Sequence, residues 1–291
     1  MTASLLLEAL VRGSVYALVA LGFAAVLGTA RVLNLSHGLF FLFGAYATYA
    51  GQQVLGAFVS TPAAVALASA AATAIAAIAG ALFFRLALRP TLDRPEHALV
   101  LCMAVNVFVT AALQVALGAR PMAVSPILEG SVAIAGGGLL RQEVLVIPVV
   151  AIAFPLLHYV LGRTSYGRAV SALAQNPHAA ALAGVDRDRV LGGVVAAAAA
   201  LAALAGALQS PMRVLAPTMW LPVLVKSFAV VTVGGLGSLR GALGAAYILA
   251  LLEIVTSRLL TDAAGEFVSL AVVVVVLAAS RGKPRELRVA A

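Results

Sequence analysis

The chain is a series of long apolar runs separated by short polar links. Each run is roughly 20 residues long, the length that an α-helix needs to cross a hydrocarbon core about 30 Å thick. Because backbone polar groups in lipid must bond within their own segment, the runs predict an all-α, polytopic membrane helix bundle of about eight or nine transmembrane segments. The runs cover about residues 5–29, 38–59, 62–84, 97–117, 144–162, 190–209, 218–236, 241–258 and 266–280.

The run at residues 218–236 has the weakest membrane-spanning pattern. It contains Pro222 and Lys226 and continues into a glycine-rich stretch. This composition is typical of a broken or re-entrant helix, which is tolerated only where protein or a cavity shields the backbone.

The basic residues predict the orientation of the bundle. They collect in the link after the third run, in the link after the fifth run and in the tail, and positively charged loops stay in the cytoplasm. We therefore expect these three segments inside and the N-terminus outside. The longest outer loop, residues 118–143, is rich in glycine and β-branched residues, and we expect a small extended flap there. The basic residues are Arg85, Arg89 and Arg94, then Arg163, Arg168, Arg187 and Arg189, then Arg281, Lys283, Arg285 and Arg288.

The composition assigns the whole chain to one membrane-embedded domain, residues 1–291. Hydrophobic residues make up 63% and charged residues 10%, with a mean hydropathy of +1.08. This balance indicates an integral membrane protein. The net charge of +8 does not indicate nucleic-acid binding, because the basic residues are scattered at the ends of apolar runs. The single cysteine, Cys102, cannot form an internal disulfide, and we expect neither a metal site nor a cofactor.

No positive charge precedes the first apolar run, since Arg12 comes after Glu8. Signal peptides begin with a basic region, so we interpret this run as a retained membrane helix. Glu8 and Arg12 are spaced i, i+4, and we expect them to form a surface pair near the outer end of the helix.

A short helix is predicted inside the second basic link, where the sequence reads GRAVSALAQNPHAAALAGVDRDRV. Asn176 has the properties of an N-cap, Pro177 loses no hydrogen bond at the first helical position, and Gly184 can end the helix in the left-handed conformation. A helix of about two turns is marginal in water unless something packs on it. Two interpretations follow: a tight connector that reverses the chain, or a docking element for a cytoplasmic subunit.

The residues before this helix repeat at helical spacing. Val170, Leu173 and Ala174 form an apolar stripe with Pro177. We expect this stripe to face the bilayer surface or a partner.

Three blocks of the sequence, in order, resemble the permease subunits of branched-chain amino acid ABC transporters. The link described above resembles their cytoplasmic loop, which resembles the coupling loop of bacterial ABC importers in general. GSVYALVALGFAAVLGTARVLNLSHGLFFLFGAY is similar to the opening pair of helices, with Arg31, Asn34, His37 and Gly38 matching its Arg-x-x-Asn-x-x-His-Gly signature. KSFAVVTVGGLGSLRGALGAAYILALLE is similar to a later block that a glutamate closes, here Glu253.

The resemblance implies the ABC importer permease fold and one half of a translocation pathway for branched-chain or related hydrophobic amino acids. The implied partners are two cytoplasmic ABC ATPase subunits, a second permease that is a related chain or a copy, and a periplasmic binding protein, at the bacterial inner membrane. Closure of the ATPases would push on the cytoplasmic loop (about residues 163–190) and open the bundle to the other side. The implied coupling residues are Gly167, Arg168, Ala174, Asn176, Pro177, Ala180, Ala181 and Gly184.

This chain is not expected to be an enzyme. It contains no phosphate-binding G-x-x-x-x-G-K-[ST] motif, so ATP hydrolysis is expected on another polypeptide. A membrane enzyme is disfavoured because neither H-E-x-x-H nor G-x-S-x-G occurs. The remaining alternative is a secondary transporter or channel acting alone, for which Glu253 is nearly the only intramembrane group suited to ion coupling.

Asn34, His37 and Gly38 join the first two predicted helices. Asn34 is placed to be the N-cap of the second helix. His37 has two interpretations: an interfacial residue bonded to backbone, or, as the resemblance implies, part of a discontinuous helix junction near the pathway. Gly38 would let two backbones approach closely.

Lys226 and Glu253 are the ionisable residues placed most deeply in apolar surroundings. Charges in membrane helices usually face the bundle interior or water with a partner, so we expect these two side chains to pair. The pair is either a helix–helix clamp or part of the pathway. Close helix packing is predicted for a glycine series that follows Lys226, namely Gly234, Gly235, Gly237, Gly241 and Gly244.

Overall fold

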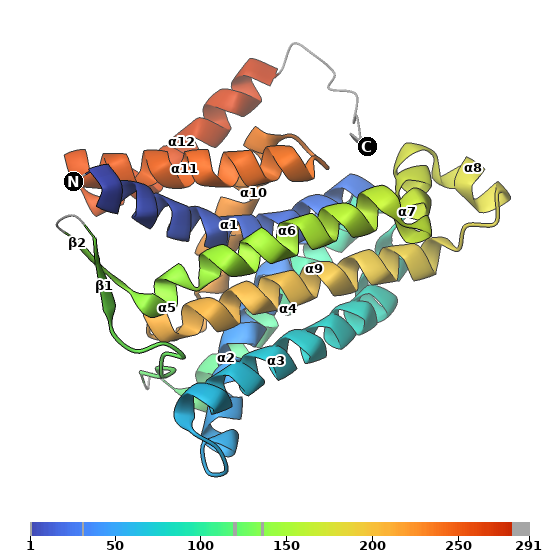
Figure 1. Cartoon of the computed structure of the whole chain (residues 1–291). Helices are drawn as coiled ribbons and strands as arrows, with labels where there is room; N and C mark the ends of the chain where they lie inside the picture. Colours follow the sequence, from blue (N-terminus) through green and yellow to red (C-terminus); the bar gives the residue numbers. More distant parts are fainter. Residues whose placement is uncertain (1, 31, 119–120, 135–136, 281–291) are drawn as a thin grey trace.

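A computed structural model describes residues 2–30, 32–118, 121–134 and 137–280. Arg31 of the predicted signature and the predicted basic tail, Arg281, Lys283, Arg285 and Arg288, lie outside these residues. The described chain is predominantly helical, as expected (Figure 1). The long helices are α1 (Thr2–Ala30), α2 (His37–Leu55), α3 (Thr61–Phe83), α4 (Pro95–Leu117), α6 (Val146–Arg163), α9 (Arg187–Gln209), α10 (Trp220–Gly234), α11 (Leu239–Leu259) and α12 (Asp262–Ser280).

Shorter elements connect these helices. A π-helical turn and a 3-10 turn, Phe84–Leu88 and Arg89–Thr91, continue α3 toward α4. The expected flap is present as an antiparallel hairpin of β1 (Ser131–Ile134) and β2 (Gly137–Leu140). The remaining elements are α5 (Arg141–Val144), α7 (Ser165–Gln175), α8 (Pro177–Leu182) and a 3-10 turn at Ser210–Met212.

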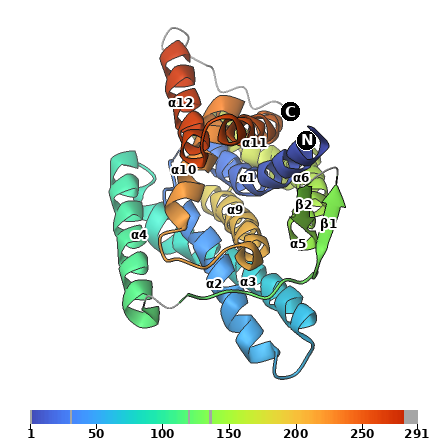
Figure 2. The ribbon, with the colours of Figure 1, turned by 90° about the vertical axis from the view of Figure 1, so that its left-hand side faces the viewer.

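Helices α1 and α9 form the centre of the bundle. Helix α1 packs against α9, α11, α10 and α6, while α9 also packs against α2 and α3. Small residues allow this close packing: a Cβ added at Gly206 or Gly44 would overlap the backbone of Phe41 or Ala203. Figure 2 shows α4 and α12 projecting from the side of the bundle, and α4 exposes apolar side chains such as Phe108 and Val115.

The two described basic links lie at the same end of the bundle. The Nε atom of Arg89 lies 2.7 Å from Oδ2 of Asp188, and Nη1 of Arg187 lies 3.5 Å from Oδ1 of Asp93. The N-terminus and the β1–β2 hairpin lie at the opposite end (Figure 1). This arrangement is the one that the predicted orientation requires.

Six helical segments of the described residues are long and apolar enough to cross a bilayer. The predicted count of eight or nine is therefore not confirmed by length and composition. Helix α10 is shorter than these segments but unbroken, because Pro222 lies in its first turn, where a proline removes no helical hydrogen bond. The six segments are Ser4–Ala30, Thr61–Thr91, Pro95–Leu117, Arg141–Arg163, Arg187–Met212 and Leu239–Leu259.

Candidate functional site

Helix α7 is held against the bundle by its own apolar stripe. Val170, Leu173 and Ala174 are buried, with exposed fractions of 6%, 2% and 4%. They pack with residues of α1, α9 and the π-helical turn, or line a cavity beside α1. The expectation that this stripe faces the bilayer surface or a partner is wrong, because the chain itself covers it.

The start of α7 is fixed by local contacts. Thr164 caps the helix, since its Oγ1 accepts a hydrogen bond of 3.1 Å from the backbone nitrogen of Gly167. Gly167 packs against the carbonyl of Leu161, where a Cβ would overlap. Tyr166 donates a 2.8 Å hydrogen bond to the carbonyl of Val190 in α9, and burial raises the pKa of Tyr166 to about 12. Arg168 is exposed. Helix α7 is therefore anchored to both α6 and α9.

The predicted caps of α8 are present. Oδ1 of Asn176 accepts hydrogen bonds from the nitrogens of His178 and Ala179, at 3.0 and 3.1 Å, and proline occupies the first helical position. Gly184 has a φ of 82°, and the nitrogen of Val185 donates to the carbonyl of Ala180 across the end of the helix. The left-handed residue lets the chain leave α8 toward α9 without a steric penalty.

Helix α8 has one buried contact and a broad exposed face. Ala180 is only 4% exposed and packs into the bundle with residues of α7 and α9, so it does not belong to a docking face, contrary to the expectation that grouped it with Ala181. Ala181 is exposed as expected. Leu182 is 87% exposed and is not among the residues that the sequence analysis singles out, although an apolar side chain two residues before the helix-ending Gly184 is a usable signal.

The α1–α2 junction is buried within the bundle. His37 is 1% exposed, and its Nε2 lies 3.0 Å from the carbonyl oxygen of Val19 in α1, so its ring contacts backbone as one interpretation expects, but inside the bundle and not at an interface. Asn34 is not the N-cap of α2, because Ser36 occupies that position. The side chain of Asn34 instead accepts from the Ser36 nitrogen at 3.1 Å, forming a turn before the helix begins. A Cβ on Gly38 would lie 2.7 Å from the carbonyl oxygen of Trp220, so α2 and α10 approach closely here, as expected.

Helix α4 bonds to this junction. Ser36 donates to the carbonyl of Cys102 at 3.2 Å, and the Asn106 amide donates to the carbonyl of Leu35 at 3.0 Å. Within the described residues, Nδ2 of Asn34 and Oδ1 of Asn106 are buried and make no hydrogen bond. The junction therefore keeps one buried donor group and one buried acceptor that have no hydrogen-bond partner within the described residues.

Lys226 and Glu253 form the predicted intramembrane pair. Nζ of Lys226 lies 2.7 Å from Oε1 of Glu253, and Glu253 is 3% exposed. Tyr16 joins them: it accepts a 2.7 Å hydrogen bond from Lys226 and donates one of 2.9 Å to Oε2 of Glu253. The pair therefore connects α10 and α11 to the central helix α1.

Arg12 and Glu8 extend the pair of Lys226 and Glu253, although the sequence pattern predicts only a surface pair of Arg12 with Glu8. Nη1 of Arg12 lies 3.2 Å from Oε1 of Glu253, and its Nη2 lies 3.3 Å from Oε1 of Glu8. Glu8 is also 3.2 Å from Arg258 in α11. The expected Glu8–Arg12 pair exists, but it belongs to a network that reaches into the bundle. We call Glu8, Arg12, Tyr16, Lys226, Glu253 and Arg258 the charge network.

The predicted glycine series divides into three kinds of position. Gly234 and Gly241 pack backbone to backbone, as expected, because a Cβ on either would overlap the other. Gly235 and Gly237 lie in the turn between α10 and α11 with φ of 96° and 80°, so their role is mainly conformational. A Cβ on Gly237 would also meet Gly28 at 3.0 Å. Gly244 has no neighbour within 4 Å of an added Cβ, so its assignment to helix packing is wrong.

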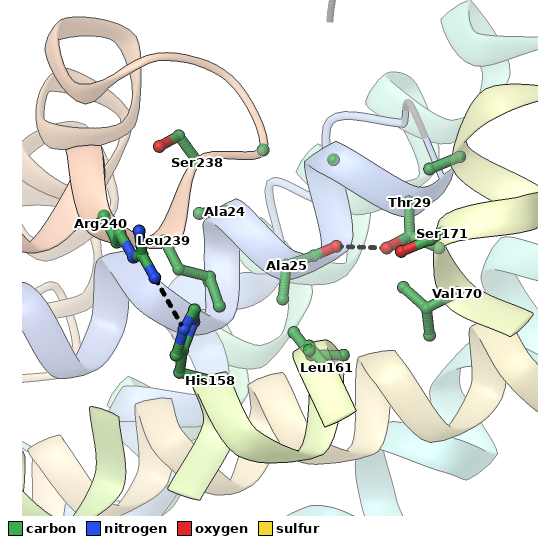
Figure 3. Close-up of a pocket in the computed structure, with 14 residues that line it drawn as sticks. Ala24, Ala25, Thr29, His158, Leu161, Val170, Ser171, Ser238, Leu239 and Arg240 are labelled. Atoms are coloured by element: carbon green, nitrogen blue, oxygen red, sulfur yellow. Dashed lines mark hydrogen bonds between the residues drawn. The ribbon is translucent and has the colours of Figure 1, made fainter. Parts of the chain in front are cut away.

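A cavity of about 150 Å³ lies between the ends of α1 and α6, helix α7 and the α10–α11 turn (Figure 3). Among the lining residues, Nη2 of Arg240 lies 3.2 Å from Nε2 of His158, and the Thr29 hydroxyl donates to the carbonyl of Ala25. Leu161, Val170 and other apolar side chains form the walls. The cavity places open space directly beside α7.

Comparison with known proteins identifies the class to which this arrangement belongs. The family described as branched-chain amino acid transport system / permease component matches residues 5–277. The chain is a multi-pass membrane permease of that family and not an enzyme, and such permeases work with ATPase and other subunits of ABC importers.

Individual relatives agree over most of the chain. It is 27% identical over 275 residues to the high-affinity branched-chain amino acid transport system permease protein LivH of Escherichia coli (strain K12). The matched region covers 91% of this chain and 89% of the relative. It is 24% identical over 281 residues to the corresponding permease protein BraD of Pseudomonas aeruginosa, covering 94% and 92%. A fructose import permease protein, FrcC of Rhizobium meliloti, is 31% identical over 131 residues, 43% of this chain and 36% of the relative. No solved structure matches the chain.

Proposed function

We propose that this chain forms half of the translocation pathway of an ABC importer that brings branched-chain or related hydrophobic amino acids across the bacterial inner membrane. Two cytoplasmic ATPases, a periplasmic binding protein and a second permease, either a related chain or a copy, complete the importer. The amino acid cargo is supported by the family description and by the names of the LivH and BraD relatives. The fructose permease relative is shorter in its match and supports a common import mechanism rather than a sugar cargo.

The main structural support for the proposal is that the α7–α8 segment is buried on one face and exposed on the other. Its inner face is held in the bundle by Leu173 and Ala180, while Leu182 at the end of α8 is 87% exposed. Helix α8 lies at the end of the bundle that carries the basic links (Figure 1). A short helix that is anchored on one side and apolar on the other is suited to receive a push from a partner and pass it to the bundle. The cavity beside α7 leaves room for such a displacement.

Under this proposal α2, α10 and α12 also cross the membrane, which gives nine crossings with the six longer segments. Helix α2 has 19 residues, roughly 28 Å at a rise of 1.5 Å per residue. Nine crossings are compatible with an outer N-terminus and an inner C-terminus.

Leu182→Asp tests the coupling role. In a partner interface the change buries an unpaired charge, so we expect it to weaken ATPase binding by about 2 kcal/mol or more. Co-purification of the ATPases and uptake of radiolabelled leucine by the assembled importer are the measurements. On an exposed connector the same change would alter stability by no more than about 0.5 kcal/mol.

Leu260→Asp is the matched control. Leu260 is 71% exposed in the α11–α12 link, at the opposite end from α8. We expect this variant to retain its ATPases. Normal assembly and uptake in Leu182→Asp would reduce α8 to a connector and remove the main support for the importer mechanism.

A further inference from the structure

A groove of about 220 Å³ lies between α10 and α12, two helices that pack side by side (Figure 2). Its walls are mostly apolar, and it carries one basic and one acidic side chain, Lys226 and Glu266. The apolar lining consists of Leu221, Pro222, Val225, Ala229 and Leu270. We infer that this groove is a resting site for the transported amino acid, with Lys226 facing its carboxylate and Glu266 facing its ammonium group. The inference rests on the proposed function and adds to it a binding place for the transported amino acid.

Lys226 retains capacity to bind a carboxylate. An ammonium group has three N–H donors, and the hydrogen bonds of Lys226 to Tyr16 and Glu253 use two of them. The side chain is 18% exposed, so it is accessible although it is paired. One donor is therefore left for a ligand in the groove.

The charge network favours an anionic group at this place. Among its members, Arg12, Lys226 and Arg258 are cations and only Glu8 and Glu253 are carboxylates, so three positive charges face two negative ones. Arg258 is 66% exposed and pairs with Glu8, so the surplus concerns Arg12 and Lys226, which share the buried carboxylate of Glu253. A buried charge of this kind is costly in a membrane protein and marks substrate paths. A ligand carboxylate beside Lys226 would balance the surplus.

Glu266 supplies the opposite charge. It is exposed on α12 and makes no ion pair within the part of the chain that the structure describes. It lies four residues after the start of α12, roughly 6 Å along the helix. A carboxylate at this depth would be unfavourable against lipid, so the groove is expected to face water or protein rather than acyl chains.

The combination selects a zwitterion with an apolar side chain. A carboxylic acid without an ammonium group would leave the Glu266 carboxylate unpaired. An amine without a carboxylate would leave the surplus positive charge of the charge network uncompensated. The cavity of Figure 3 is a poorer candidate, because Arg240 and His158 line it but no aspartate or glutamate does. Of the two cavities, only the groove offers a partner to each charge of an amino acid.

Cysteine protection in the assembled importer tests the site. The natural Cys102 is fully buried and will not react, so Leu270→Cys places one reactive thiol in the groove. The thiol is labelled with a membrane-impermeant methanethiosulfonate in the presence and absence of L-leucine. We expect leucine at ten times its Kd to slow labelling about tenfold, because the rate follows the free fraction of the site.

Leu260→Cys is the control for this measurement. Leu260 is 71% exposed in the link before α12, where a water-soluble reagent reaches it, and it does not line the groove. We expect its labelling to be unaffected by leucine. Equal labelling of Leu270→Cys with and without leucine would overturn the inference.

Adding Glu266→Gln to Leu270→Cys tests the role of the acid. Loss of one charged hydrogen bond should raise the leucine concentration for half-protection about tenfold. Protection by 4-methylpentanoate, which lacks the ammonium group, should not weaken, and this analogue therefore serves as the folding control. An unchanged leucine concentration for half-protection would overturn the role of Glu266.

Uptake by the wild-type importer separates this inference from the proposed function. If wild type transports leucine but leucine does not protect Leu270→Cys, the groove assignment fails and the importer assignment stands. If wild type transports no amino acid, the proposed cargo fails and the groove assignment fails with it.

Discussion

Nζ of Lys226 lies 2.7 Å from Oε1 of Glu253, and the two side chains are held together on α1 by Tyr16. Residues 27 positions apart in sequence are thus joined through a helix that neither belongs to. Arg12 adds a second cation to the same carboxylate at 3.2 Å. The two members of the pair therefore differ: the Glu253 carboxylate contacts two cations, whereas the Lys226 ammonium group contacts one carboxylate.

This asymmetry predicts unequal effects of removing the two charges. Glu253→Gln leaves Lys226 and Arg12 without their shared anion, and breaking a buried pair typically costs about 3–5 kcal/mol. Lys226→Met leaves Glu253 paired with Arg12, so we expect a smaller loss. The midpoint of thermal unfolding in detergent measures both. If Lys226→Met lowered the midpoint more than Glu253→Gln, the position of Glu253 at the centre of the network would be contradicted.

A glycine comparison on α11 tests the backbone contact between α10 and α11. Gly241→Ala forces a Cβ into the carbonyl of Gly234 and should destabilise the bundle by about 1–3 kcal/mol. Gly244→Ala is the same change one turn along the same helix, at an exposed position with no neighbour, and should be neutral or stabilising by about 0.5–1 kcal/mol. Thermal unfolding of the two variants decides the point, and equal destabilisation would contradict the contact.

The N-cap of α8 can be tested by the hydrogen exchange of the segment that it caps. Asn176→Ala removes the acceptor for the nitrogens of His178 and Ala179 and should cost about 1 kcal/mol of local stability. Hydrogen exchange of the segment 176–184 should rise about fivefold, the equivalent of that energy. Asn176→Asp, which keeps the cap oxygen, should exchange like wild type. Unchanged exchange in Asn176→Ala would mean that packing of Ala180 alone orders the helix.

The sequence predicts the local structure correctly wherever residues adjacent in the chain decide it. Asn176, Pro177 and Gly184 define α8 by rules that involve only adjacent backbone groups, and the structure follows them. The pairing of Lys226 with Glu253 was also predictable, because a charge in an apolar run must find a partner.

Features that depend on which helices become neighbours could not be predicted from the sequence. The sequence pattern predicts that the stripe around Leu173 faces the bilayer surface or a partner, but the ends of α1 and α9 cover it, and no periodicity within α7 reveals this. For the same reason the sequence pattern wrongly predicts that Arg12 pairs only at the surface and that Gly244 is a packing residue. Asn34 fails as an N-cap because the turn that it forms delays the helix to His37, a choice that the sequence pattern leaves open.

The orientation of the bundle yields the last prediction. The links that carry Arg89 and Arg187 lie at one end with α8, and the β1–β2 hairpin lies at the other. Because basic links stay in the cytoplasm, Gln175→Cys in α7 should resist an impermeant thiol reagent added to intact cells, whereas Glu129→Cys beside the hairpin should react once the outer membrane is permeabilised. Both positions are exposed and Cys102 is buried, so reactivity reports the side of the membrane. Breaking the inner membrane should expose Gln175→Cys, which serves as the control for its accessibility. Labelling of Gln175→Cys in intact cells at the rate of Glu129→Cys would invert the topology, and α8 would then have no access to a cytoplasmic ATPase.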